Sequence, residues 1–171
     1  MGLFDYAEIV MAGPSCVVVA AHPESDAQAE HFIRAVAGDH APDDILSVGD
    51  TTTLGGSYQG ESRPFVLGRE TLAADEIEYA QLERLLGGSI TCAVELGAMC
   101  KSSVDYLVLG ELAIELAARM RGLILLGDEV RAYPTLGTVA VITTAEGYRY
   151  SAVDSVALRD LLSRGISVFV K

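Results

Sequence analysis

The sequence predicts an α+β fold in which a mixed or antiparallel sheet carries helices packed on one side. Half of the 171 residues are apolar, which is enough for a sizeable core. Short β-branched runs alternate with segments of helical period, and in two places strand-like runs follow one another without a helix between them. No linker rich in proline, glycine or serine divides the chain. We therefore expect a single domain over residues 1–171, with residues 1–12 as a candidate N-terminal extension.

The first elements are a strand, a helix and a strand. The run SCVVVAAH at residues 15–22 is β-branched and stops at a proline, which predicts a buried strand. Residues 26–37 predict a helix, because their apolar side chains share one face and a glycine follows them. Ser25 directly precedes this helix and is its expected cap. Residues 45–54 combine alternating polarity with a threonine run, so we expect a strand that is broken at Gly49.

A loop, a strand, a helix and a strand complete the first half. The glycine-rich segment 55–60 predicts a flexible hairpin loop, because it lacks the Gly-Lys-Ser/Thr ending of a phosphate-binding loop. Residues 63–70 predict a strand, in which Pro64 indicates a first residue or a sheet edge. Residues 75–86 have an amphipathic pattern that ends at a glycine pair, which predicts a helix, and residues 89–96 predict the next strand.

The second half predicts a helix, three strands, a helix and a strand, over residues 103–121, 123–126, 138–144, 148–153, 155–164 and 166–170. The long first helix has a wide apolar stripe and Ser102 or Ser103 as its cap, so we expect it to pack against a sheet. A Glu-Gly turn joins two of the strands into a hairpin, and Asp154 caps the last helix.

Along the chain, the expected order is therefore βαββαβ followed by αβββαβ. The first six elements match the split βαβ, or ferredoxin-like, arrangement. The second half approximates the same order if the strand at residues 89–96 serves both halves. Strands that follow each other without a helix favour a mixed or antiparallel sheet.

The formal net charge is −12 at pH 7, from 12 basic and 24 acidic residues. This balance argues against a surface that binds DNA or RNA, because neutralising phosphates requires an excess of Lys and Arg, and against docking on anionic lipid. The longest apolar stretch, residues 90–126, is interrupted by charges and predicts no membrane span. Residues 1–100 hold 16 acidic and 4 basic residues, whereas residues 101–171 hold 8 of each. The net charge thus belongs to the first half.

The acidic first half has two interpretations. In the first, the acidic residues form a solvated face that keeps the protein soluble. In the second, they form a docking face for a basic protein, because a negatively charged surface accelerates association with a positively charged partner. Tyrosines are favoured at interfaces, so Tyr133, Tyr148 and Tyr150 are further contact candidates; for Tyr148 and Tyr150 the alternative is that they belong to a sheet face. The candidate partner-binding residues are Asp43, Asp44, Asp50, Glu61, Asp75, Glu76, Glu78 and Tyr58.

The sequence contains no motif that names a reaction. Cys16 and His22 would share one face of the first strand at about 20 Å, which is too far for a nucleophile–base pair. A less favoured alternative is an enzyme that uses His31 or His40 beside a cysteine or a carboxylate. Calcium-loop and zinc-ligand spacings are both missing, so we expect no metal and no cofactor.

The remaining polar patterns have structural explanations. Lys101 is followed by two serines, and a helix start explains them better than a Ser–Lys dyad. Glu111, Glu115 and Arg119 are four residues apart, which predicts an exposed ion-pair stripe on the long helix. The three cysteines form no CxxC pair, and the N-terminal segment lacks the features of a signal peptide, so we expect a cytoplasmic protein.

The last third of the chain has a pattern of its own. The run GELAIELAARMRGLILLGDEV at residues 110–130 predicts a helix that leads into a Gly–apolar–Asp/Gly turn. The run YRYSAVDSVALRDLLSRGISVFVK at residues 148–171 predicts a late hairpin, an Asp-capped helix and a terminal strand. Together they resemble the ending of small uncharacterised bacterial proteins that are similar to immunity proteins of polymorphic-toxin systems. The resemblance implies a function of neutralising a partner, and it assigns no site residue.

The leading hypothesis is a non-enzymatic acidic protein that binds a basic protein, such as a toxin domain, over its active surface. The main alternative is a small-molecule-binding regulatory module of ferredoxin-like type, which rests on fold analogy. An enzyme that depends on Cys and His is the least favoured. The sequence predicts neither the identity of the partner nor the oligomeric state.

Overall fold

The structure is a computed structural model that describes residues 13–37, 45–130, 135–166 and 168–169. Its strands are β1 Ser15–Ala20, β2 Ile45–Asp50, β3 Gln59–Arg69, β4 Cys92–Ala98, β5 Leu123–Leu126, β6 Val139–Thr143 and β7 Arg149–Val153. Its helices are α1 Ser25–Ala37, α2 Glu76–Leu86, α3 Ser103–Met120 and α4 Ser155–Ser163, with a short 3-10 turn, η1, over Thr52–Leu54. The predicted α+β class is confirmed. Across these ranges, no helix combines the length and the apolar character that a membrane span requires.

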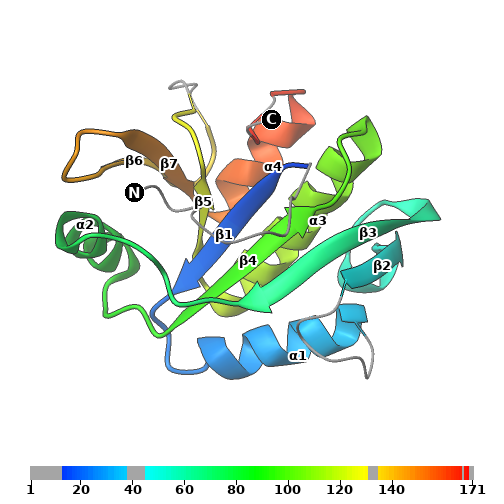
Figure 1. Ribbon diagram of the computed structural model, residues 1–171, viewed down its shortest axis with the longest axis horizontal. Helices are drawn as coiled ribbons and strands as arrows, with labels where there is room; N and C mark the ends of the chain where they lie inside the picture. Colours follow the sequence, from blue (N-terminus) through cyan, green and yellow to red (C-terminus); the bar gives the residue numbers. More distant parts are fainter. Residues whose placement is uncertain (1–12, 38–44, 131–134, 167, 170–171) are drawn as a thin grey trace.

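The seven strands form one antiparallel sheet in the order β2-β3-β4-β1-β5-β7-β6 (Figure 1). The central strand is β1, in which Val18 pairs with Val94 of β4 on one side and with Ile124 of β5 on the other. The first six elements follow the expected βαββαβ order along the chain, with β4 placed between β3 and β1. Strands β5, β7 and β6 extend the same sheet, so both halves of the chain share it.

Both faces of the sheet carry helices. Strand β1 directs Cys16 and Val18 into one core and Val17 and Val19 into the other, as the period-2 alternation of a strand requires. Helices α1, α3 and α4 pack on the first face, whereas α2 packs on the second, where its Leu82 is fully buried. Figure 1 shows α2 apart from the other three helices, on the side of β6 and β7. The expected one-sided packing thus holds for three helices, because the sheet centre is apolar on both faces and both need cover.

Three local expectations are wrong. Pro64 lies inside β3, between β2 and β4, and marks neither a strand start nor a sheet edge. The strand expected over residues 45–54 ends early, and η1 forms its last part. The described residues of the segment 166–170 form no strand; instead Val168 and Phe169 are buried in the core beneath α3 and α4. Their apolar pattern therefore reflects the packing of an irregular segment.

The ends of the helices follow their predicted signals in most cases. Ser102 caps α3 and Asp154 caps α4, each with its side chain accepting a backbone amide of the first turn. Gly87 ends α2 in the left-handed conformation, at a φ of 74°. Ser25 behaves differently: it is the first residue of α1, and its buried hydroxyl donates to the Met120 carbonyl at 2.9 Å, which ties α1 to the end of α3.

Candidate functional site

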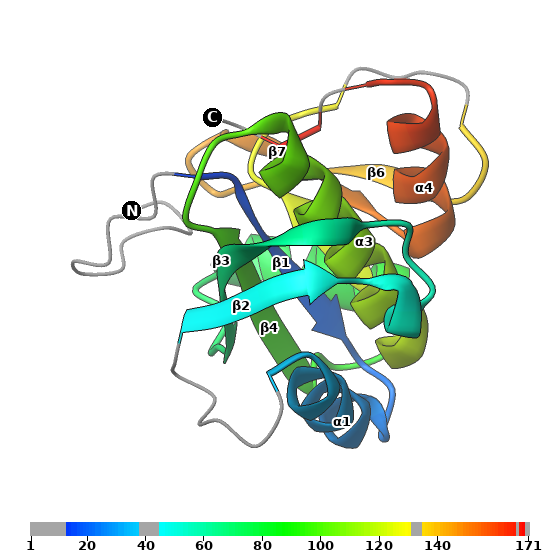
Figure 2. The ribbon, with the colours of Figure 1, turned by 90° about the vertical axis from the view of Figure 1, so that its right-hand side faces the viewer.

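The predicted acidic residues lie in two groups at opposite edges of the sheet. Asp50 and Glu61 belong to β2 and β3, and Figure 2 views the molecule from the edge that these strands form. Residues 75–78 form the start of α2, which contacts β6 at the other edge. Asp43 and Asp44 lie outside the described residues. The described members of the set therefore do not share one continuous face.

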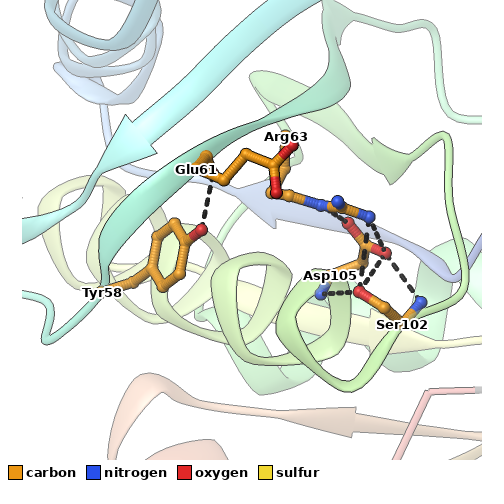
Figure 3. A network of polar contacts seen from close by, with 5 residues as sticks. All are labelled: Tyr58, Glu61, Arg63, Ser102 and Asp105. Atoms are coloured by element: carbon orange, nitrogen blue, oxygen red, sulfur yellow. Dashed lines mark hydrogen bonds and ion pairs between the residues drawn. The ribbon is translucent and has the colours of Figure 1, made fainter.

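At the β2–β3 edge, two of the predicted binding residues have structural partners. Oδ1 of Asp50 accepts hydrogen bonds from the hydroxyl of Thr52 at 2.5 Å and from its amide at 2.7 Å, and these donors lower the pKa of Asp50. The Tyr58 hydroxyl donates to the backbone carbonyl of Glu61 at 2.5 Å (Figure 3). Tyr58 is half-buried and packs against the core, whereas Glu61 is exposed.

The glycine-rich loop next to Tyr58 is held by Glu111 of α3. The Glu111 carboxylate accepts from the Thr51 hydroxyl at 2.5 Å and from the Ser57 amide at 2.8 Å, and also from the Ser57 hydroxyl. Burial alone would raise the pKa of Glu111, but these donors outweigh it and lower the pKa. Gly56 passes so close that an added Cβ would lie 2.5 Å from Oε2 of Glu111. The loop is therefore anchored to α3, which its glycine content did not predict.

The expected exposed ion-pair stripe on α3 is wrong. Glu111 holds the loop, and Glu115 pairs with Arg159 of α4 at 3.4 Å. The guanidinium of Arg119 lies 5.3 Å from the centre of the Phe32 ring of α1. These side chains join α3 to three different neighbours. Their i,i+4 spacing therefore serves tertiary contacts and does not form ion pairs along the helix.

A buried ion pair joins the β2–β3 edge to the start of α3. Arg63 of β3 contacts Asp105 at two points, Nε to Oδ1 at 2.8 Å and Nη2 to Oδ2 at 3.0 Å (Figure 3). The amide and the hydroxyl of Ser102 each donate to Oδ2 of Asp105 at 2.7 Å. Arg63 first, and then Ser102, lower the pKa of Asp105 although its side chain is fully buried. The pair spans 42 residues of sequence and has no local pattern that could have predicted it.

At the other edge, the acids at the start of α2 form a capping box. Oδ1 of Asp75 accepts the Glu78 amide at 2.8 Å, and Oε2 of Glu78 accepts the Asp75 amide at 2.9 Å. Oδ2 of Asp75 accepts the Ala145 amide at 2.7 Å, and the Ala145 and Glu78 amides lower the pKa of Asp75. Of the three predicted acids in this turn, Glu76 is the one that is exposed.

A pocket of about 750 Å³ lies behind this capping box. The segment before α2 and the start of α2 form one wall, and the β6–β7 turn and β7 form the other; Val17 and Leu125 of the sheet contribute apolar lining. The described lining residues are Val17, Ala73, Ala74, Asp75, Glu78, Leu125, Leu126, Gly127, Thr144, Ala145, Glu146, Tyr148 and Tyr150. This set contains three carboxylates and no Lys, Arg or His. A mostly apolar pocket with a few polar groups has the composition and size of a ligand site.

Two buried polar atoms of the pocket lining have no hydrogen-bond partner: Oε1 of Glu78 and the hydroxyl of Tyr150. Glu78 is 4% exposed and Tyr150 is 2% exposed. Burial, and then the nearby Glu78 carboxyl, raise the pKa of the Tyr150 hydroxyl, although the geometry between the two groups makes no hydrogen bond. Native structures rarely leave such atoms unsatisfied, so the pair marks this pocket as the candidate functional site.

The sequence placed Glu78 and Tyr150 among residues that contact a partner on the surface, and both lie inside the molecule instead. Tyr148, two residues before Tyr150 on the chain, is 53% exposed, lines the pocket and donates its hydroxyl to the Gly127 carbonyl. The centroids of the Tyr148 and Tyr150 rings lie 6.4 Å apart. Tyr133 lies outside the described residues.

A family model with the description "Family of unknown function (DUF6368)" matches residues 12–161. The chain belongs to this family. The matched range contains β1 to β7, α1 to α3 and every described residue that lines the pocket. No curated protein and no solved structure matches this DUF6368 chain.

The described cysteine and histidine candidates of the DUF6368 chain do not assemble into a site. Cys16 is fully buried, and burial raises its pKa far above the ordinary value of a thiol. The His22 ring contacts the Arg121 guanidinium at 3.2 Å, His31 is exposed on α1, and His40 lies outside the described residues. Within the described ranges, no group of three or more His, Cys, Asp and Glu side chains is arranged to hold a metal ion.

Proposed function

We propose that this member of the DUF6368 family is a non-enzymatic binding protein that docks a basic protein over the α2 surface. We define the α2 surface as Glu76 and Ile77 at the start of α2, together with Glu146 and Tyr148 of the β6–β7 hairpin, which line the pocket. The observation that carries the proposal is that exposed apolar side chains accompany acidic ones both at the start of α2 and in the β6–β7 hairpin. Ile77 and Tyr148 are each 53% exposed.

The chemistry of the α2 surface suits a basic partner. Exposed aromatic and aliphatic side chains supply most of the affinity in protein interfaces, and charges of one sign supply steering. The overall charge of −12 adds a long-range attraction for cations, which acts over about one Debye length, or about 8 Å at physiological salt. A partner that covers α2 leaves Glu61 at the far edge of the sheet, so the α2 surface and the β2–β3 edge can be tested separately.

The resemblance of residues 110–130 and 148–171 to immunity-like proteins supports a narrower proposal, namely that the basic partner is a toxin domain. These segments supply part of α3, β5, β7 and α4. In an immunity protein the docked surface would cover the active surface of the toxin without any bond being made or broken.

Two single charge reversals test the proposed surface. Glu76→Lys and Glu61→Lys make the same change in net charge at opposite edges of the sheet. Binding is measured by stopped flow against a basic protein identified by cross-linking in the host or as the product of the neighbouring gene. We expect Glu76→Lys to slow association by about fivefold or more at low salt, and Glu61→Lys by less than about twofold. Equal effects of the two reversals, or association that does not depend on salt, would contradict the proposal.

A second candidate function rests on the pocket itself. Its size and its unsatisfied polar atoms favour a module that binds a small molecule, with or without a protein partner. A thermal-shift screen with metabolites tests this function, because a ligand that binds only the folded state raises the melting temperature.

A further inference from the structure

The pocket behind α2 contains a buried carboxylate oxygen that the protein leaves without a partner. Glu78 is 4% exposed, its Oε2 is used by the Asp75 amide at 2.9 Å, and its Oε1 accepts no hydrogen bond. A buried carboxylate oxygen with no donor is costly, and proteins normally supply a cation or a hydrogen-bond donor. Within the described part of the chain, the pocket lining contains neither Lys, Arg nor His.

The surroundings of Glu78 favour a ligand that brings positive charge. Asp75 and Glu146 line the same pocket, so an anionic ligand would meet carboxylates on both walls. The Tyr150 hydroxyl also lacks a partner, and the nearby Glu78 carboxyl contributes to the rise in its pKa. The hydroxyl oxygen is therefore a second acceptor for a donor placed between Tyr150 and Glu78. The two residues come from different elements, α2 and β7, and both line one cavity.

The hydrogen bonds already made by Glu78 select the kind of cation. A guanidinium binds a carboxylate best through both oxygens, but the capping box occupies Oε2. A primary ammonium group is a compact donor that needs one carboxylate oxygen and can donate its other protons elsewhere. The apolar lining at Val17 and Leu125, and the rings of Tyr148 and Tyr150, suit an apolar or aromatic body attached to that group.

We propose that the pocket behind α2 binds a primary amine carried on an apolar body, with its ammonium group held between Oε1 of Glu78 and the hydroxyl of Tyr150. The cavity of about 750 Å³ exceeds the volume of the ammonium group alone, so most of the contact would be made by the apolar body. The same chemistry is offered by a free aliphatic or aromatic amine and by a lysine side chain of a partner protein. This inference does not depend on the proposed docking of a basic protein.

Calorimetry with the full chain tests the chemistry of the group. The probes are 2-phenylethylamine, its neutral isostere 2-phenylethanol, the anion 3-phenylpropionate and the guanidine analogue of the amine. We expect the amine to bind at least about tenfold more tightly than the alcohol, since a hydrogen bond to a charged group contributes that much or more. The anion should not bind, and the guanidine should bind more weakly than the amine. Equal binding of amine and alcohol, tighter binding of the guanidine, or no binding of the amine would overturn the proposal.

Two conservative variants test the residues. Glu78→Gln keeps the capping box, because glutamine also serves at this position, and it removes the charge. Tyr150→Phe removes only the hydroxyl. We expect Glu78→Gln to weaken amine binding by about tenfold or more, Tyr150→Phe to weaken it by about threefold or more, and the matched variant Glu61→Gln to leave it unchanged. The melting temperature of Glu78→Gln without ligand should equal or exceed that of the parent protein, which separates lost binding from lost folding. Amine binding that survives in both pocket variants would overturn the proposal.

A final arm distinguishes the two sources of the amine. A peptide with lysine between two leucines is titrated against the protein, alone and in the presence of 2-phenylethylamine. Competition between them assigns the pocket to a lysine side chain of a partner, and binding of the free amine alone assigns it to a small molecule; both results support the amine site. Because Glu76→Lys leaves the pocket residues in place, amine binding that persists in this variant while protein docking is lost shows that the two proposals stand or fall separately.

Discussion

Oδ2 of Asp75 accepts a hydrogen bond from the Ala145 amide at 2.7 Å, across 70 residues of sequence. The other carboxylate oxygen caps α2 by accepting the Glu78 amide. One side chain thus starts the helix and fixes the β6–β7 turn against it, which defines two walls of the pocket. The acid that the sequence analysis proposed for steering a partner thus connects two elements of the fold.

The two roles of Asp75 can be separated by mutation. In the variant Asp75→Asn, the new side chain would still cap the helix through its carbonyl oxygen, but it has no second acceptor for the Ala145 amide. Asp75→Ala would lose both bonds. Amide hydrogen exchange should accelerate at Ala145 in both variants, and at Glu78 only in Asp75→Ala. Unchanged exchange at Ala145 in Asp75→Asn would show that the hydrogen bond between Asp75 and Ala145 is not formed in solution.

The Arg63–Asp105 pair should make stability depend on pH in the acid range. The pKa of Asp105 in the folded protein lies below its ordinary value of 3.8, mainly because of Arg63. The unfolded chain therefore binds the proton more readily, so this stabilisation is present above about pH 4 and is lost as the pH falls through the lowered pKa. The substitution Asp105→Asn should lower the free energy of unfolding by about 2 kcal/mol at neutral pH. The free energy of unfolding of this variant should also change less with pH between about pH 2 and about pH 4.

Urea unfolding at a series of pH values measures this dependence. The variant Glu76→Gln removes an exposed carboxylate and serves as the control, with a profile close to that of the parent protein. If Asp105→Asn retains the acid dependence of the parent protein, other carboxylates carry it and the assignment to Arg63 fails.

Gly56 should tolerate no side chain, because the loop lies directly on Glu111. An added Cβ would lie 2.5 Å from both Oε2 of Glu111 and the Thr51 hydroxyl oxygen. Gly56→Ala should destabilise the fold by about 1–3 kcal/mol, as overpacking does. Gly68 is a matched control, since an alanine there would meet its nearest neighbour, Glu70, at 4.0 Å. Thermal unfolding of both variants checks the difference, and equal melting temperatures would contradict the anchored loop.

The cysteines should differ in their reaction with iodoacetamide at about pH 8. Burial raises the pKa of Cys16 far above its usual range and that of Cys92 to about 11, so neither thiol ionises appreciably at this pH. Cys100 is half-buried and should be labelled first. Peptide mass spectrometry follows the order of labelling. Rapid modification of Cys16 in the folded protein would reveal a reactive thiolate and favour the enzyme hypothesis.

Most elements of the fold could be predicted from local signals. Strand runs, helix periods, the caps Ser102 and Asp154 and the stop at Gly87 all act within a few residues, and the structure places them close to the expected positions. The face on which α2 packs could not be predicted in this way. Its position depends on the two-sided burial of β1 and on contacts with the β6–β7 hairpin, which are distant in sequence.

The candidate site was only partly accessible from the sequence. Glu78 and Tyr150 were singled out, but as surface residues, because a carboxylate at a helix start and a tyrosine in a hairpin are normally exposed. The pocket forms where the segment before α2 meets the end of β5 and β7, and nothing in the sequence indicates that these elements are close. The charge count also could not show that Asp75 accepts a hydrogen bond from a distant amide or that Asp105 pairs with Arg63.

The central place of β1 has a consequence for synthesis on the ribosome. Val18 pairs with Val94 on one side and with Ile124 on the other, so β1 stays without these neighbours until β4 and β5 have been translated. Pairing between such distant segments slows folding. The nascent chain therefore carries an unpaired valine-rich strand while the residues between β1 and β5 are synthesised. The sixteen acidic residues among residues 1–100 would make such chains repel one another, which opposes their aggregation.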